Sequence, residues 1–215
     1  EKIISILPEW FNFSGDVLQN KMPSFDHDGG QYESVNYANF AIQEAALFLL
    51  ACKNSSPEIK LPNIPQLHET LNYFVHVSYP RNGELRSINF GDSHKTITAE
   101  SSLEILYALG YCHDKNALWY FSQVKDEQTR DGFFRSRPMG YTFMPSTKGA
   151  PQTPDMAKCQ LFRDFGVATL RDSWEKDATL LAVKSGHTWN HCHADANSLI
   201  LFHHGTDLIK DAGNC

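Results

Sequence analysis

The chain has 215 residues, of which 41% are hydrophobic and 20% charged, and its formal net charge is −6. This length can bury the core of one large domain or two small ones. The acidic balance argues against a general nucleic-acid binder, although a local cluster of Arg and Lys can oppose the global sign. Five scattered cysteines without a C-x-x-C pair argue against a disulfide scaffold or a cysteine-rich zinc module.

The first two thirds of the chain are predicted to be helical. Apolar residues recur at helical spacing in 36–51 and in 65–79, and the second segment opens with proline, which suits a first helical turn. Segment 98–110 ends at a glycine typical of a helix C-terminus, and segment 114–124 begins with an aspartate that can cap a helix. Irregular loops are expected at 24–34 and 79–96. The longest apolar run is shorter than a bilayer span, so we expect no membrane span.

The pattern changes after about residue 131. The segment that follows is rich in proline and glycine and predicts a linker or a long surface loop. Short apolar or alternating runs then predict antiparallel strands at 165–172, 178–186, 197–205 and 206–213. Helices followed by strands indicate the α+β class.

We therefore expect a helical domain over 1–130, a linker over 131–160 and a β domain over 161–215. A sheet of about four strands would leave an exposed edge, which indicates a piece of a longer protein.

The segment from 187 to 213 reads HTWNHCHADANSLILFHHGTDLIKDAG and is dense in histidine and aspartate. On a strand, His191 and His193 face the same side and can converge on one point. Two imidazoles and a carboxylate suit zinc, and a hairpin would return Asp211 beside His193. Asp195 is a competing ligand or a partner for a histidine. The alternative is that two surface histidines share a strand by chance, and spacing alone favours a metal only slightly.

Two earlier loops also carry polar residues. In DHDGGQYESVNYANF (26–40), tyrosines at the mouth of a helical domain are usually rim residues, and the alternative is an acid–base or sugar-stacking tyrosine. In NFGDSHKT (89–96), Gly91, Asp92 and Ser93 are typical of a cap or turn. Arg81, Arg86 and Lys95 form a modest basic cluster that could face an anionic substrate.

Together these motifs, in this order, resemble the heparinase II/III-like polysaccharide lyases over residues 24–213. DGGQYESVNYANF is similar to that family's D-G-x-Q-x-E…Y segment, and NFGDSHKT resembles its F-G-D-S loop. The C-terminal segment resembles H-x-H-x-D-x-x-S followed by G-x-x-L-x-x-D-x-G.

The resemblance implies a partial (α/α) toroid followed by the start of an antiparallel β-sandwich. It also implies cleavage of an anionic, uronic-acid-containing polysaccharide by β-elimination, in which a base removes the C5 proton and an acid protonates the departing O4. The residues that it carries over are Tyr37 and His191 as catalytic groups, His193 and Asp211 as zinc ligands, and Gln31 and Glu33 as lining of the substrate cleft. Arg81 and Arg86 are expected to bind the substrate because they belong to the basic cluster described above.

The zinc implied by the resemblance is structural, and its third protein ligand is expected beyond the end of this chain. A group that neutralises the uronate is expected before its beginning, so the partners include the missing N- and C-terminal parts of the same enzyme. The resemblance further implies a periplasmic or secreted protein. We expect Tyr37 to act as the base. The helix N-terminus, together with Arg or Lys side chains of the 79–96 loop, is expected to lower the pKa of its phenol.

Two other classes of function stay open at this point. One is a non-catalytic carbohydrate-binding or structural member of the same fold. The other is a zinc hydrolase, which needs an open metal position and a nearby general base, and the sequence has no H-E-x-x-H pattern.

Overall fold

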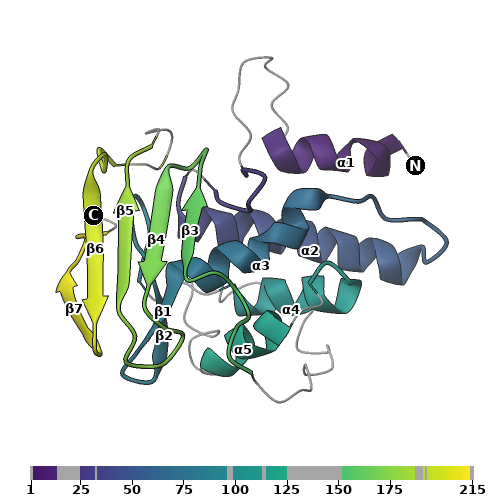
Figure 1. Ribbon diagram of the computed structural model, residues 1–215. Helices are drawn as coiled ribbons and strands as arrows, with labels where there is room; N and C mark the ends of the chain where they lie inside the picture. The colour runs from purple at the N-terminus through teal and green to yellow at the C-terminus, as the bar shows by residue number, and fades with distance from the viewer. Residues whose placement is uncertain are drawn as a thin grey trace.

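The structure is a computed structural model that describes residues 2–13, 25–31, 33–95, 99–112, 115–124, 152–186, 191 and 193–213. Helices occupy one side of the molecule and a sheet the other (Figure 1). The helices are α1 (Lys2–Phe13), α2 (Val35–Ser55), α3 (Pro65–Val77), α4 (Glu100–Leu109) and α5 (Lys115–Gln123). The strands are β1 (Ser78–Arg81), β2 (Glu84–Ser87), β3 (Cys159–Phe162), β4 (Val167–Arg171), β5 (Leu180–Lys184), β6 (Ser198–His203) and β7 (Thr206–Ile209).

The predicted helix signals are confirmed where the structure describes them. Pro65 is the first residue of α3, where its missing N–H costs nothing. Gly110 ends α4 in the left-handed conformation, with φ of 93°. The predicted aspartate cap before α5, like most of the predicted linker, lies outside the described residues.

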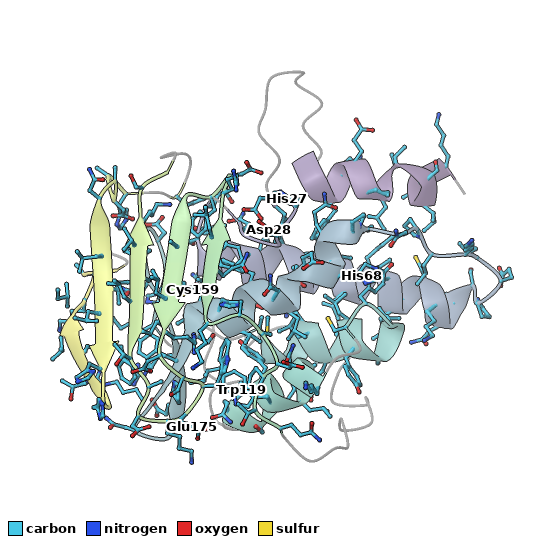
Figure 2. The ribbon with its side chains drawn as sticks, in the orientation of Figure 1. His27, Asp28, His68, Trp119, Cys159 and Glu175 are labelled. Atoms are coloured by element: carbon cyan, nitrogen blue, oxygen red, sulfur yellow. The ribbon has the colours of Figure 1, made fainter. Side chains whose placement is uncertain are left out.

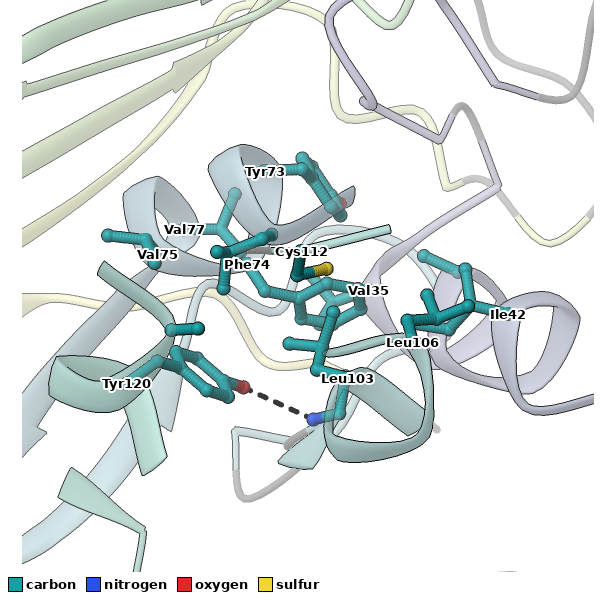
Figure 3. Close-up of a cluster of buried hydrophobic side chains, with 14 of the residues drawn as sticks. Val35, Ile42, Tyr73, Phe74, Val75, Val77, Leu103, Leu106, Cys112 and Tyr120 are labelled. Atoms are coloured by element: carbon teal, nitrogen blue, oxygen red, sulfur yellow. Dashed lines mark hydrogen bonds between the residues drawn. The ribbon is translucent and has the colours of Figure 1, made fainter. Parts of the chain in front are cut away.

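Helix α2 runs through the middle of the helical layer and packs mainly against α4. Its side chains, together with those of α3 and α5, enclose a cluster of buried apolar groups (Figure 3). Within this cluster the Ala99 N–H donates to the hydroxyl of Tyr120 at 3.1 Å. By length and hydropathy α2 is also the one described helix that could cross a membrane. Since Ile42 and Leu49 are fully buried inside the fold, α2 has the character of a core helix.

Strands β1 and β2 form an antiparallel hairpin where we predicted an irregular loop. The turn residues Asn82 and Gly83 have φ of 53° and 75°, which is the geometry of the two-residue turns that Asn-Gly favours. The prediction of a loop over 79–96 is therefore wrong at its beginning. The Asn82-Gly83 pair is the sequence signal that predicts this hairpin.

The other five strands form one antiparallel sheet in the order β3-β4-β5-β6-β7. The four predicted strands correspond to β4 to β7, and the predicted turn at Gly205 is confirmed, with φ of 79°. Strand β3 was not predicted and lies across the expected boundary between linker and β domain. These elements confirm the α+β class.

The sheet and the helices share one hydrophobic core. Phe162 of β3 meets Tyr73 of α3 edge to face, with ring centroids 5.1 Å apart, and Phe202 of β6 packs on Tyr79. Trp119 of α5, labelled in Figure 2, meets Trp174 of the β4–β5 loop at 5.5 Å. The boundary between the predicted helical and β domains thus separates two layers of one packed unit.

A buried arginine fastens the two layers. Arg171 of β4 donates from Nη2 to the carbonyl oxygens of His76 at 2.9 Å and Ser78 at 2.8 Å, at the C-terminal end of α3. Its guanidinium also lies 4.1 Å from the centroid of the Trp174 ring. A cation at the negative end of a helix is well placed electrostatically, and these carbonyls replace the water it loses.

His76 gives the fold a pH dependence. Burial, and then the charge of Arg171, lower the pKa of this imidazole to about 4, against about 6.5 in an unfolded chain. Between pH 4 and pH 6.5, His76 is therefore protonated in the unfolded state but not in the folded state. The contribution of His76 to stability is therefore fully present above pH 6.5 and is lost, by an amount on the order of 3 kcal/mol, as the pH drops toward 4.

Urea unfolding at pH 7, 6 and 5 measures this effect. We expect His76→Gln to unfold with a shallower dependence on pH than the unchanged chain, and His204→Gln, at an exposed turn residue, to keep the full dependence. Equal slopes in all three proteins would show that His76 is not the responsible group.

Candidate active site

The candidate site forms where three segments meet, namely the first turn of α2, loop 89–95 and the segment from His191 to Asp195. The rings of Tyr37 and His191 are stacked, with centroids 3.8 Å apart and planes 18° from parallel. Both side chains are partly exposed. The structure thus brings together the two residues predicted to be catalytic, which lie more than 150 positions apart in the sequence.

Asp92 holds both histidines of the H-x-H motif. Its Oδ2 lies 3.1 Å from Nδ1 of His191, and its Oδ1 lies 2.9 Å from Nε2 of His193. The hydrogen bond from His191, followed by that from His193, lowers the pKa of the Asp92 carboxyl. An ionised carboxylate accepts from an N–H, so this contact favours the tautomer of His191 with its proton on Nδ1, in which Nε2 has a lone pair.

The backbone of the same loop fixes the geometry further. The Asp92 N–H donates to the carbonyl of His191 at 3.0 Å, and His191 has φ of 60°, a left-handed conformation that this bond helps to hold. The Gly91 N–H donates to Oδ2 of Asp195 at 2.7 Å. Asp195, which we considered as a metal ligand or a histidine partner, therefore supports the loop that carries Asp92.

Ser93 connects this loop to α2. Its hydroxyl accepts the N–H of Asn36 at 2.9 Å, so it satisfies one of the free donors in the first turn of the helix that carries Tyr37. The predicted cap role of Gly91-Asp92-Ser93 is correct in kind, but the capped helix lies 57 residues earlier. The role of Asp92 toward the histidines was missed. The signal was its place in a loop that resembles a family motif.

The D-x-G motif packs against the other end of the loop. Oδ1 of Asp211 accepts the N–H of Gly213 at 2.6 Å, and its backbone carbonyl accepts from Nδ2 of Asn89 at 3.3 Å. A Cβ on Gly213 would lie 2.5 Å from that nitrogen, and φ is 76°, so glycine is required.

A complete metal site is not present in the described part of the chain. No group of three or more His, Cys, Asp or Glu side chains in those ranges could hold an ion. His193 faces Asp92, and one carboxylate oxygen of Asp211 is engaged by Gly213. The assignment of His193 and Asp211 as zinc ligands stays a prediction.

The environment of Tyr37 differs from our expectation. Burial, then the charges of Asp92 and Glu33, raise the pKa of the phenol. The expectation that the helix N-terminus would lower this pKa is therefore wrong, because burial, and then the charges of the two nearby carboxylates, disfavour the phenolate. Tyr37 carries its proton at neutral pH and suits an acid better than a base.

The other predicted substrate residues lie in two places. Gln31 is buried, and its Oε1 accepts the N–H groups of Glu33 at 2.6 Å and Ser34 at 3.0 Å, which organises the entry into α2. Arg81 and Arg86 lie on the β1–β2 hairpin, where Arg81 pairs with Asp207 and Arg86 with Glu84. Contact with a substrate stays a prediction for all four.

The fold is similar to that of known lyases. A crystal structure of heparinase III superposes with a TM-score of 0.70 at 15% identity, covering 99% of this chain and 30% of that one. A heparinase III gene product with methylated lysines gives 0.69 at 19% identity, covering 98% and 27%. The heparan sulfate lyase of Pedobacter heparinus gives 0.58 at 16% identity, covering 88% and 26%.

These likenesses show a shared fold. The chain spans less than a third of the length of each of these structures. No protein-family model and no curated protein sequence matches it.

Asp92→Asn tests the arrangement of the histidines. The amide keeps the shape but loses the charge, and it offers an NH₂ group where the imidazoles donate. We expect nitrogen NMR of the imidazoles to show His191 losing its preference for the Nδ1–H tautomer. The exposed Asp155→Asn is the matched control. An unchanged tautomer in Asp92→Asn would contradict the hydrogen bond to His191.

Proposed function

We propose that this chain carries the acid–base pair of a polysaccharide lyase that cleaves uronic-acid-containing chains by β-elimination. The observation that carries the proposal is the stacking of Tyr37 on His191 while Asp92 holds Nδ1 of that histidine. The likeness of the fold to heparinase III and heparan sulfate lyase supports the class of reaction. The activity belongs to the whole protein, of which this chain supplies one part.

The two groups divide the proton transfers between them. Nε2 of His191, with its free lone pair, removes the proton from C5 of the uronate, and the electrons of the C5–H bond form the C4=C5 double bond. The C4–O4 bond breaks, and the phenol of Tyr37 donates its proton to the departing oxygen. The products are an unsaturated uronate and a new reducing end. Gln31 and Glu33 are proposed to line the cleft beside this pair.

Asp92 also helps to keep His191 as the base and Tyr37 as the acid. Asp92 stabilises the imidazolium that forms when His191 takes the proton, since the carboxylate is already hydrogen-bonded to Nδ1. Burial, and then the same negative charge together with that of Glu33, raise the pKa of Tyr37 and keep it protonated before the reaction. One carboxylate thus favours a base in one neighbour and an acid in the other.

Tyr37→Phe tests the acid. The unsaturated product absorbs in the ultraviolet, because its double bond is conjugated with the carboxylate, so initial rates can be followed directly on heparan sulfate, heparin, alginate and hyaluronan. We expect turnover to fall by about 10²–10⁴-fold while the melting temperature stays the same. Tyr107→Phe, in α4, is the control.

The same assay distinguishes a polysaccharide lyase from a non-catalytic member of the fold. A full-length protein that binds these polysaccharides but produces no ultraviolet signal would be a carbohydrate-binding member of the fold. Near-normal turnover in Tyr37→Phe would remove the tyrosine from the mechanism.

We also propose a structural zinc held by His193 and Asp211, with a further ligand outside this chain. Two ligands are fewer than structural zinc takes, so the 215-residue chain is expected to hold the metal weakly or not at all. In the full-length protein, His193→Ala should lose zinc and melt at a lower temperature. His191→Ala should keep the zinc and lose turnover. Loss of zinc from both variants would place His191 in the coordination sphere.

The same reasoning extends to the architecture and the location. The outward face of the five-stranded sheet carries the exposed apolar side chains of Leu161, Leu170, Leu199 and Leu208. Such a face favours cover by a second sheet, as in the proposed β-sandwich, and the helices are proposed to belong to an incomplete (α/α) toroid. A polysaccharide substrate favours a periplasmic or secreted protein.

A further inference from the structure

A nearly buried carboxylate joins the β1–β2 hairpin to the edge of the sheet. The Asp207 side chain on β7 is 5% exposed and forms an ion pair with Arg81 of β1. It also accepts from the hydroxyl of Tyr79 at 3.3 Å and lies 3.7 Å from Nζ of Lys95. One negative charge is therefore shared by two cations and a hydroxyl donor.

The surroundings hold more positive than negative charge. The pKa of the Lys95 ammonium is lowered by burial first, and the charges of Lys210, Arg81 and Arg86 lower it further against the opposing effect of Asp207. Arg86 itself pairs with Glu84 at 2.8 Å. Four cations thus gather around two carboxylates in a chain whose net charge is −6. We call Arg81, Arg86, Lys95 and Lys210 the basic patch.

The basic patch is held in place and is open to a ligand. Asp207 fixes Arg81 and Lys95, so little side-chain entropy is lost when an anion binds them. The side chains of Arg81, Arg86 and Lys95 are 32%, 26% and 20% exposed, and Lys210 is exposed. Gathering like charges costs free energy that a bound anion would recover.

The patch borders the candidate active site. Lys95 follows Asp92 by three residues, so their Cα atoms are at most about 11 Å apart. The Lys95 carbonyl accepts the N–H of Ser87 at 2.8 Å, which ties the loop to the hairpin. Lys210 directly precedes Asp211, whose carbonyl is bonded to Asn89 at the beginning of the same loop. One oligosaccharide could reach both places.

We propose that the basic patch is an anion subsite that binds a sulfate or carboxylate group of the polysaccharide, one or more sugar units from the bond that is cleaved. The inference rests on the proposed lyase function for the identity of the ligand. The subsite positions the polymer, and it leaves the acid–base chemistry to Tyr37 and His191.

The test is oligosaccharide binding to the Tyr37→Phe chain, which prevents turnover. Lys210→Gln, in that background, should weaken binding of a heparan sulfate oligosaccharide roughly fivefold at low salt, since one exposed charge contributes about 1 kcal/mol. The dependence of binding on salt should become shallower. Lys60→Gln, the same charge change in the α2–α3 loop, is the control. A second variant, Arg86→Gln, should act in the same direction as Lys210→Gln.

Two modified ligands identify the anion. If a desulfated oligosaccharide no longer distinguishes Lys210→Gln from the parent, the subsite binds sulfate. If instead a carboxyl-reduced oligosaccharide no longer distinguishes Lys210→Gln from the parent, the subsite binds carboxylate. Equal binding by the parent, Lys210→Gln and Arg86→Gln, or equal weakening by Lys60→Gln, would overturn the subsite.

Binding and turnover report separately on the two proposals. Binding that depends on Lys210 in a full-length protein without any lyase activity would keep the subsite and reject the elimination. Lyase activity whose KM does not change in Lys210→Gln would keep the elimination and reject the subsite.

Discussion

The carboxylate of Asp92 is the contact on which the site depends. It bonds His191 and His193, and its own N–H holds the left-handed backbone of His191. Its neighbours Gly91 and Ser93 attach the same loop to Asp195 and to the first turn of α2. Two segments far apart in the sequence, the first turn of α2 and the segment from His191 to Asp195, are thus assembled around one short loop. Without this loop, nothing in the described part of the chain would hold Tyr37 and His191 in the stacked arrangement.

Such a pair also needs the two layers of the fold to stay in register, because Tyr37 comes from a helix and His191 from the segment that enters the sheet. Arg171 contributes this rigidity. A buried guanidinium without partners would be costly, but here it finds the carbonyl oxygens at the end of α3 and the face of Trp174. The shared core of aromatic side chains adds apolar burial across the same junction.

The sequence was sufficient for features whose cause is local. Pro65, Gly110 and the alternating runs of β4 to β7 act within a few residues of the structure that they determine. The Asn-Gly turn of the first hairpin is equally local and was overlooked. The pairing of Arg81 with Asp207 joins residues 126 positions apart, and no periodicity encodes it. The raised pKa of Tyr37 likewise depends on burial and then on the charge of Asp92, both of which arise only in the folded chain.

The placement of charge follows a consistent pattern. Asp92 and Glu33 make the surroundings of Tyr37 negative, whereas Lys95, three residues after Asp92, belongs to a positive patch. A polyanion approaching this loop is repelled at one end and attracted at the other, over a distance comparable to the screening length at physiological salt. In the proposed enzyme, this gradient would draw the charged groups of the polymer toward the hairpin.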